Sequence, residues 1–359
     1  MKGLRIFFAL VFLTLLNFVS SFSSDVDNAN PSGDNDVFSA VGGFEAVQAS
    51  FESFVDRFNK VYVSPIERQN RMRIFAQNLR RYAEMNKADR GTAVYGVDAF
   101  SDWTFEEFKE KFMGLKRPAG PRPGKPYNKK DLNKKIPTDW DWREKGAVSP
   151  IKYQGGCGSC WAFSAVANLE GLYYIKHKQM ELFSEQQIVD CDKKSFGCEG
   201  GWMTFACEYV RDAGGLERSS DYPYTYRDGT CAFNKSAAIL KVNSVVSLPR
   251  DEKKIAAYLH SYGPVSVALD ANGMWGYKSG IAHPPESICS KKEDDLNHGI
   301  TLVGYGVKVF KEGNKKKKLP FWVAKNSWSE RFGDKGYYYL YRGDGSCGIN
   351  LEASSATIE

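Results

Sequence analysis

One cysteine in the middle of the chain has the sequence surroundings of a nucleophile. Cys160 stands where a glycine-rich turn, Gln-Gly-Gly-Cys-Gly-Ser, meets an apolar run of helical character that continues to about residue 178. The free N–H groups and partial positive charge at a helix N-terminus favour a thiolate over a thiol. Because the thiolate is the reactive form, the sequence predicts nucleophilic chemistry at Cys160.

A thiolate nucleophile needs a proton acceptor, and the chain has only four histidines. His298 opens a strand-like apolar run, His-Gly-Ile-Thr-Leu-Val, which would hold an imidazole on a rigid element. The other three lie in charged, helical or proline-flanked segments, at positions 177, 260 and 283. We therefore predict that His298 is the base.

Two further polar residues complete the predicted site. The amide of Asn326, in Ala-Lys-Asn-Ser-Trp, would bond the imidazole and fix its tautomer without adding a charge, and Trp328 would shield that bond from water. Gln154, six residues before the cysteine, is placed to donate its amide to a developing oxyanion. Together these residues predict hydrolysis through a thiolate–imidazolium pair.

Each of these residues also has a simpler interpretation. A Cys-x-x-Cys pair is often a redox or zinc motif, a lone histidine is usually structural, and an isolated Asn-Ser-Trp carries no information. A zinc site is the main alternative for four of the cysteines, at positions 157, 160, 191 and 198. The combination favours catalysis, and the predicted chemistry requires neither a metal nor a cofactor.

Composition and charge argue against other classes of protein. Hydrophobic residues make up 42% and charged residues 26% of the 359 positions, which is ordinary for a globular protein. The net charge of +6 is not concentrated in a basic arm or an aromatic–basic stripe, so no nucleic-acid partner is predicted. The lysine cluster at 315–318 is interpreted as a solvated surface loop.

The N-terminus has the pattern of a secretory signal peptide. Two basic residues precede an apolar run over residues 6–19, and serines follow up to residue 24. Because the apolar run is short for a membrane span, we expect cleavage after residues 1–24 and no membrane span afterwards; an uncleaved anchor is the alternative. The secretory pathway, leading to a lysosome or the exterior, would also allow the eight cysteines to form disulfides.

The chain changes in character near residue 137. Apolar residues recur at helical spacing from Phe44 to about Lys87, with a break near Pro65, which predicts two amphipathic helices. A short strand at 92–97, a short helix at 104–112 and an exposed proline- and glycine-rich linker at 116–135 are expected next. Helical patterns at 158–178, 184–190 and 202–213 then precede a strand-rich half, so an α+β fold is predicted.

The segment 154–164 resembles the nucleophile region of papain and the cathepsins. His298 follows Cys160 by 138 residues, within the roughly 130–150 typical of that family. Asn326 follows it by 166, and the lysine cluster looks like the insertion that accounts for the excess. The resemblance, from about residue 48 to the C-terminus, implies a cysteine endopeptidase with a papain-like fold, in which an active-site cleft separates a helical left half from a β-barrel-like right half.

The front segment is similar to cathepsin L-like propeptides. The residues that match their spaced helix motif are Glu67, Arg71, Phe75, Asn78 and Asn86, with Tyr82 where isoleucine is usual. Residues 96–102 resemble a second propeptide motif, while 89–96 are closer to cathepsin F, so the subfamily stays open. The resemblance implies that 25–135 form a helical inhibitory propeptide lying through the cleft, and that 136–359 form the mature peptidase. The carboxylates of Glu67, Asp98 and Asp102 suggest the hypothesis of activation at acid pH.

The family pattern also implies three disulfides, which are Cys157–Cys198, Cys191–Cys231 and Cys289–Cys347. Cys207 is left over and is interpreted as a buried, inert thiol. Two residues depart from the pattern: Ser329 replaces the usual glycine, and Phe332 stands where a second tryptophan is common. Neither transfers protons, so we expect altered packing and not loss of activity.

By the same resemblance, specificity depends on the substrate side chain two positions before the cut bond. Gly201 would bind the substrate backbone, and the residues implied as pocket lining are Trp202, Met203, Ala268 and Leu296, with Glu352 at the floor. We expect a preference for hydrophobic side chains, with arginine accepted when Glu352 is ionised; a Glu352 turned to solvent is the alternative.

The resemblance implies three kinds of partner: protein and peptide substrates, the chain's own propeptide, and cystatin-type inhibitors. It also implies that the enzyme is a monomer. The alternative function is that of a catalytically inactive papain-fold protein that binds or inhibits. Such proteins typically lose the nucleophile or the base, and both are retained here.

Overall fold

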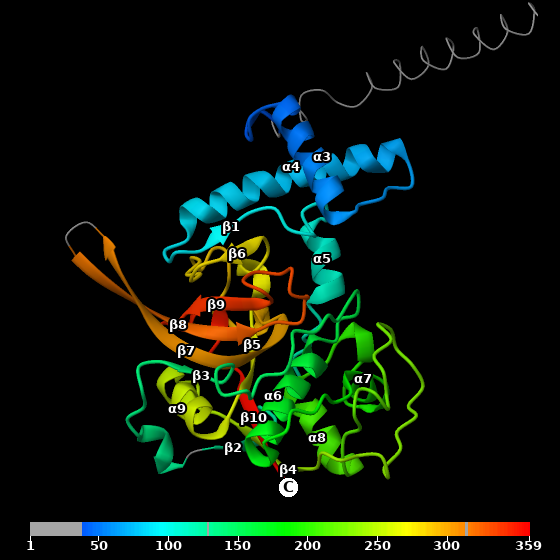
Figure 1. The fold of residues 1–359 in the computed structure, drawn as a ribbon, viewed down its shortest axis with the longest axis vertical. Coiled ribbons are helices and arrows are strands. Elements are labelled where there is room, and N and C mark those ends of the chain that lie inside the picture. Colours follow the sequence, from blue (N-terminus) through cyan, green and yellow to red (C-terminus); the bar gives the residue numbers. More distant parts are fainter. Residues whose placement is uncertain (1–37, 128, 313–314) are drawn as a thin grey trace, which may run out of the picture. The chain divides into compact units, whose positions relative to one another are not determined.

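The computed structural model describes residues 38–127, 129–312 and 315–359 (Figure 1). The chain divides into two compact units, one up to Arg81 and the other from Tyr82 to Glu359. The predicted signal peptide lies outside the described residues. Within the described ranges, no helix has the length and apolar character needed to cross a membrane.

The first unit is built from two helices. Helix α3 (Phe44–Phe58) and helix α4 (Pro65–Ala88, which continues into the second unit) are separated where the sequence predicts a break. Proline suits the first position of a helix because its missing N–H would have no intrahelical partner there. The Phe75 ring packs between Phe51 and Phe54, at centroid distances of 5.5 and 5.0 Å. An aromatic core therefore holds the two helices together.

The second unit begins with the remainder of the predicted propeptide. Strand β1 (Val94–Tyr95) is held by Asn86, whose side-chain amide exchanges two hydrogen bonds of 2.8 Å with the backbone of Tyr95. Helix α5 (Phe105–Phe112) starts with a capping box, in which Thr104 and Glu107 satisfy each other's backbone N–H groups. The short strand and the short helix expected from the sequence are both confirmed.

Three helices form the first half of the predicted mature region. They are α6 (Cys160–His177), α7 (Glu185–Cys191) and α8 (Met203–Ala213), close to the predicted ranges. Helix α6 is apolar on nearly all sides and is buried along most of its length, as expected for a central helix. It packs on α7, α8 and strands of the second half.

The second half is a mainly antiparallel sheet. Its strands, in spatial order, are β2 (Lys125–Pro126), β4 (Val242–Ser247), β10 (Ala353–Ile358), β5 (Val265–Leu269), β7 (His298–Glu312), β8 (Lys315–Lys325) and β9 (Tyr337–Tyr341), with β3 (Trp140–Asp141) paired to β7. Strand β6 (Tyr277–Ser279) pairs with β1, and helix α9 (Glu252–Tyr262) lies near β7. The predicted α+β, papain-like architecture is confirmed, with helices in one half and the sheet in the other (Figure 1).

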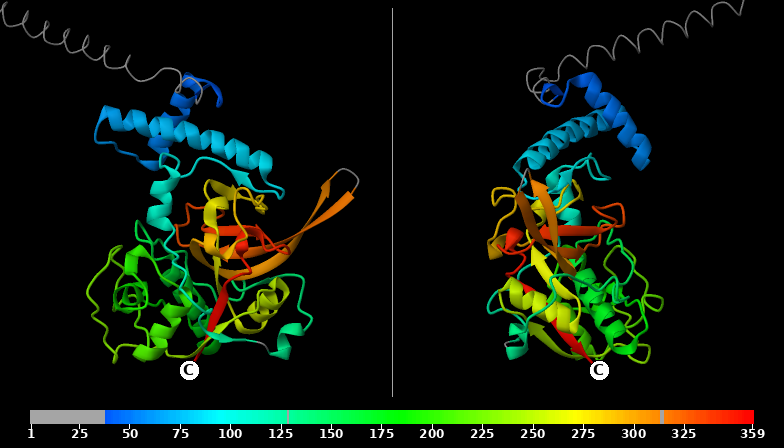
Figure 2. Two further views of the ribbon diagram at one scale, coloured as in Figure 1. Left: turned by 180° about the vertical axis from the view of Figure 1, so that it is seen from behind. Right: turned by 60° about the vertical axis from the view of Figure 1, so that its left-hand side comes forward.

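The interpretation of the lysine cluster as a surface loop is wrong. Strands β7 and β8 continue through it as a paired ribbon, with Val309 opposite Lys318 and Phe310 opposite Lys317. The β-branched and aromatic residues of β7 favour extended pairing, while exposed lysines are tolerated because neither face of the ribbon is buried there. Figure 2 shows this hairpin projecting from the sheet.

The structure contains the disulfides Cys157–Cys198, Cys191–Cys231 and Cys289–Cys347, the pairs that the resemblance implied. The zinc alternative is wrong, because three of its four proposed ligands, Cys157, Cys191 and Cys198, form disulfides.

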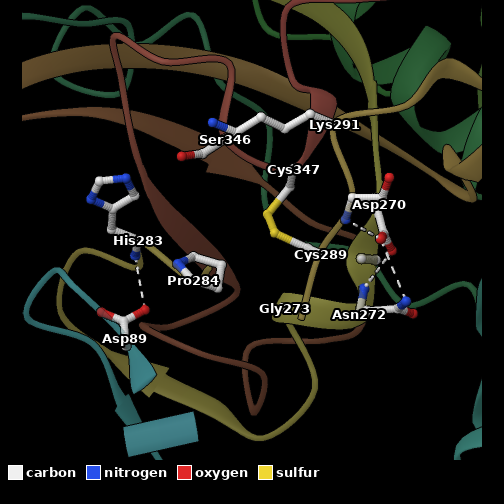
Figure 3. Close-up of a disulfide and its surroundings, with 12 residues drawn as sticks. Asp89, Asp270, Asn272, Gly273, His283, Pro284, Cys289, Lys291, Ser346 and Cys347 are labelled. Carbon is white, nitrogen blue, oxygen red and sulfur yellow. Dashed lines mark hydrogen bonds between the residues drawn. A yellow bond between two sulfur atoms is a disulfide. The ribbon is translucent and has the colours of Figure 1, made fainter. Parts of the chain in front are cut away.

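Figure 3 shows Cys289–Cys347 beside Asp270, whose carboxylate accepts hydrogen bonds from the backbone of Ser290 and Asn272. In the same view Asp89, in the predicted propeptide, accepts a 2.9 Å bond from the backbone N–H of His283.

Candidate active site

Cys160 is the first residue of α6, as the sequence predicts. The turn before it is fixed from both sides: the Cys157–Cys198 disulfide ties it to the neighbouring loop, and the N–H of Gly158 donates to the carbonyl of Cys198 across 2.8 Å. The sulfur therefore lies at the positive end of a long, buried helix dipole. The side chain of Cys160 is completely buried.

Strand β7 carries His298 to the start of α6 from the other half of the fold. Its second residue, Gly299, packs against the start of α6, where a Cβ would come within 3.4 Å of the Cys160 carbonyl oxygen and 3.5 Å of Trp161 Cα. Pairing of β7 with β8 then places Asn326 beside the histidine, where Asn326 Oδ1 lies 2.8 Å from His298 Nε2. The Trp328 ring covers this bond, 4.6 Å from the imidazole. Nε2 is thus engaged, and Nδ1 is the nitrogen left for a proton from the thiol.

Gln154 is held in a fixed orientation. Its Oε1 accepts a 2.7 Å hydrogen bond from Ser327 Oγ, and its backbone N–H donates to the carbonyl of Ser327 across 2.9 Å. Its Nε2 donates to the carbonyl of Cys157 at 2.9 Å and to that of Phe112 at 3.2 Å. Asn326 is therefore paired with His298, and Gln154 is paired with Ser327, the residue after Asn326. The amide nitrogen of Gln154 points to the carbonyl oxygens of Cys157 and Phe112.

The Phe112 carbonyl that Gln154 contacts belongs to the last residue of α5, and a non-helical segment, residues 113–116, follows it. The N–H of Gly201 donates to the carbonyl of Gly114 at 2.9 Å, and the N–H of Lys116 donates to the carbonyl of Gly201 at 3.0 Å. The N–H of Leu115 donates to the carbonyl of Asn297 at 3.1 Å. The segment therefore crosses the site from Gln154 to Gly201 and covers Cys160.

Burial has a strong effect on the pKa values of Cys160 and His298. Burial raises the pKa of the Cys160 thiol to about 11, although the backbone N–H groups of Gly299 and Gly114 act to lower it. Burial also lowers the pKa of His298 to about 4, although its hydrogen bond to Asn326 acts to raise it. Between these two values both groups are neutral, so the covered site holds a thiol and an imidazole, not an ion pair.

Comparison with known proteins identifies the protease domain and an inhibitor domain that ends just before the covering segment. Residues 136–357 match the model of the papain family of cysteine proteases, and residues 51–108 match that of the cathepsin propeptide inhibitor domain. The chain belongs to the papain family of cysteine proteases. It is a proform, because it carries the family's inhibitory propeptide domain ahead of the protease domain.

The relatives of this papain-family chain include cathepsin F of Drosophila melanogaster and of Mus musculus. Each is 42% identical to it, over 318 and 310 residues, and the matches cover 88% and 86% of this chain. The chain spans only 51% and 64% of those relatives' own lengths. Among solved structures, the digestive procathepsin L2 proteinase of Tenebrio molitor matches with a TM-score of 0.77 and 33% identity, over 87% of this chain and 99% of that one.

The residues implied as the papain-family specificity pocket share one buried apolar cluster with Leu115, a residue of the predicted propeptide. Leu115, of which only 8% is exposed, belongs to one buried apolar cluster whose members include Trp202, Met203, Ala268 and Leu296. The backbone of Gly201 binds the residues on either side of Leu115, through its hydrogen bonds to Gly114 and Lys116. Leu115 therefore lies beside Gly201 and within the same apolar cluster as the predicted pocket residues.

Glu352 is next to this pocket, but its carboxylate is already paired. Its backbone carbonyl accepts from Ala268, which places it beside the pocket. One carboxylate oxygen lies 2.7 Å from Arg122 Nε, in the predicted linker, and the other lies 3.1 Å from Arg250. Only 5% of Glu352 is exposed, so the alternative of a glutamate turned to solvent is wrong. Burial raises the pKa of Glu352, although both arginines act to lower it.

A buried charge network beneath the site was not anticipated from the sequence. Lys152 Nζ lies 2.6 Å from both Glu170 and Glu185, and Lys325, adjacent to Asn326, donates to Ser149 at 2.6 Å. Burial lowers the pKa of Lys325 to about 8. The sequence contained one signal of this network, which was Lys325 within the apolar run of β8. Lysines are rarely buried without charged or polar partners.

Proposed function

We propose that the mature chain is a cysteine endopeptidase in which Cys160 is the nucleophile, His298 the base and acid, Asn326 the group that orients the imidazole, and Gln154 the oxyanion donor. The observation that carries this assignment is the pair of bonds from Asn326 to His298 and from Gln154 to the Phe112 carbonyl. The bond from Asn326 supports a fixed tautomer of His298. The bond from Gln154 to Phe112 supports Gln154 as the donor to the carbonyl oxygen of a substrate.

In the proposed reaction, His298 Nδ1 takes the Cys160 proton, and the thiolate attacks the carbonyl carbon of the scissile bond. Negative charge develops on the carbonyl oxygen, where the Gln154 amide and the Cys160 backbone N–H stabilise it. The imidazolium returns its proton to the leaving amine as the C–N bond breaks. Water, deprotonated by His298, then hydrolyses the thioester.

The same proposal covers specificity. The buried apolar cluster around Leu115 supports a preference for a hydrophobic side chain two positions before the cut. Arginine binding is supported by the way Glu352 already holds the guanidinium of Arg122. The residual pairing with Arg250 would reduce the charge available to such a substrate after the linker has left.

We further propose the division of the chain into a signal peptide (1–24), an inhibitory propeptide (25–135) and a mature domain (136–359). Passage through the secretory pathway to a lysosome or the exterior agrees with the three disulfides. Inhibition by cystatin-type proteins and a monomeric state belong to the same proposal and rest on the family resemblance.

The test is labelling of acid-matured protein with a thiol-directed, peptide-based active-site reagent, combined with peptide hydrolysis. We expect one label at Cys160, lost in Cys160→Ala and strongly reduced in His298→Ala, and hydrolysis lost in both. Cys207→Ala is the matched control, because Cys207 is also a free, buried cysteine and should not take the label. Matured protein that binds the peptide but neither reacts nor hydrolyses it would instead support the inactive binding protein.

A further inference from the structure

Two exposed tyrosines stand beside the loop that carries Gln154. Tyr153 is 43% exposed and Tyr226 54%, and their ring centroids lie 6.2 Å apart. They come from segments more than 70 residues apart in the chain, so tertiary structure alone brings them together. Large exposed aromatic side chains that cluster near a cleft are typical of binding surfaces.

The backbone at Tyr226 adopts a conformation that is unusual for a residue other than glycine. Its φ is +62°, in the left-handed region that residues other than glycine adopt only at a cost. The ring nevertheless lies against the backbone of Gly155: a Cβ on that glycine would come within 2.6 Å of Tyr226 Cδ1. Tyr224 supports the ring from the other side, at a centroid distance of 5.0 Å. A strained residue with an exposed ring is a reason to look for a function.

The propeptide segment shows on which side of the cut bond these rings lie. The carbonyl of Phe112 is at Gln154, and residues 114–116 run along Gly201, the proposed anchor for the substrate two positions before the cut. The side chain of Lys111, the residue before Phe112 in helix α5, reaches Gly156, where its Cδ lies 3.6 Å from the position of a Cβ. Gly155 and Gly156 therefore lie beyond the oxyanion donor from Gly201, on the side that receives the leaving group.

We propose that Tyr153 and Tyr226 form a binding site for an apolar, preferably aromatic, side chain at the second or third substrate residue after the cut bond. We expect a substrate side chain to bind here, because the two rings continue the surface of the loop 153–156, which is proposed to receive the scissile carbonyl. The Tyr226 ring packs against Gly155 and Tyr224, and the backbone of Tyr153 is held by a bridge to Trp328, so the Tyr226 ring loses little side-chain freedom on binding. This inference rests on the proposed endopeptidase function.

The experiment compares peptides that differ only after the cut. Internally quenched peptides with an identical sequence up to the first residue after the cut would carry Phe, Leu, Gly or Lys at the next two positions, and a dipeptidyl coumarin amide would have no residues there. We expect Tyr226→Gly to lower kcat/KM for the Phe peptide roughly three- to tenfold more than for the Gly peptide or the coumarin amide. Tyr226→Phe should keep the preference, and Tyr153→Ala should reduce it.

Lys178→Gly is the matched control, because Lys178 has a similar φ of +58° but lies at the far end of the 18-residue helix α6, about 27 Å along its axis. It relieves backbone strain in the same way and should change no substrate preference. An equal loss on all substrates, or an unchanged Phe preference in Tyr226→Gly, would overturn the aromatic site while leaving the endopeptidase assignment intact. Failure of the unsubstituted enzyme to cleave even the coumarin amide would overturn both.

Discussion

The side-chain amide of Gln154 donates to the main-chain carbonyl of Phe112 across 3.2 Å, so the predicted propeptide presents a carbonyl oxygen to the group proposed as oxyanion donor. The amide is held there by Ser327, whose hydroxyl binds its oxygen and leaves its nitrogen to donate. The precursor is therefore blocked through the same polar contact that the reaction is proposed to use.

Replacing Gln154 with alanine should lower kcat by on the order of 100-fold or more, because one preorganised donor to the oxyanion is lost. KM should change much less, since the donor acts mainly on charge that develops in the transition state. Steady-state kinetics of the matured variant would measure both. Gln179→Ala, at an exposed glutamine beyond the C-terminal end of α6, is the control. A loss of kcat below tenfold would contradict the role of Gln154.

The Cys160 thiol should be unreactive in the precursor. Burial raises its pKa to about 11 and lowers that of His298 to about 4, so at pH 6 the covered pair is neutral and the nucleophilic thiolate is absent. Removing residues 112–116 restores solvent, which favours the ionised pair. The rate of alkylation at pH 6, followed by mass spectrometry, should rise at least tenfold on maturation. Cys207, whose pKa burial raises to about 12, should stay slow in both forms.

Glu352 should decide whether arginine is accepted two positions before the cut. Glu352→Ala should abolish cleavage after Arg-X pairs while sparing Phe-X and Leu-X, measured as kcat/KM on matched coumarin amides. Arg250→Ala should increase cleavage after Arg-X, because the remaining partner of the carboxylate is removed. Unchanged arginine cleavage in Glu352→Ala would show that its carboxylate does not reach the pocket.

The linker should loosen from the mature body as pH falls. For Glu293, burial acts to raise the pKa, but Arg250 and the linker residue Arg117 outweigh it and lower the pKa below its usual 4.5. The hydrogen bond from Tyr262 lowers the pKa of Asp131 below 3.8. A carboxylate with a lowered pKa stabilises the docked linker fully above its usual value and progressively less as pH falls through the lowered one.

Limited proteolysis of residues 116–135 in the Cys160→Ala precursor should therefore accelerate below about pH 4.5. Arg117→Ala should make cleavage faster at pH 6 and less dependent on pH, whereas Lys125→Ala, at an exposed residue of β2, should behave like the parent. Cleavage that is equally fast at pH 6 and pH 4 would contradict the acid-labile linker.

Ser329 should be a site where glycine stabilises the enzyme. Its φ is +66°, the left-handed region, where a side chain costs about 1 kcal/mol that glycine avoids. Ser329→Gly should raise the free energy of unfolding of the matured Cys160→Ala protein by about that amount, measured by urea denaturation. Ser329→Ala keeps the Cβ and should give no gain. If glycine gives none either, the strain at Ser329 is not what limits stability.

Local patterns were sufficient for the elements and for the chemistry of the site. Pro65 marks the break between two helices, Thr104 begins α5, and the glycine-rich turn before Cys160 places the cysteine at a helix N-terminus. The lysine cluster was mistaken for a loop because charge suggests solvent exposure, whereas strand formation there depends on pairing with β7. The disulfide pairs and the other expectations taken from the family resemblance could not be derived from the physical chemistry of this one sequence.

The sequence by itself determined which residues have the chemistry of a cysteine protease and which helices and strands carry them, because helix caps, turns and apolar periodicity act over a few residues. Only the tertiary structure decided what those groups meet: the imidazole 138 residues from the sulfur, the Phe112 carbonyl at Gln154, the two arginines on Glu352, and the rings of Tyr153 and Tyr226. Such contacts, and the pKa values that follow from burial, depend on how distant segments pack, and no local spacing encodes them.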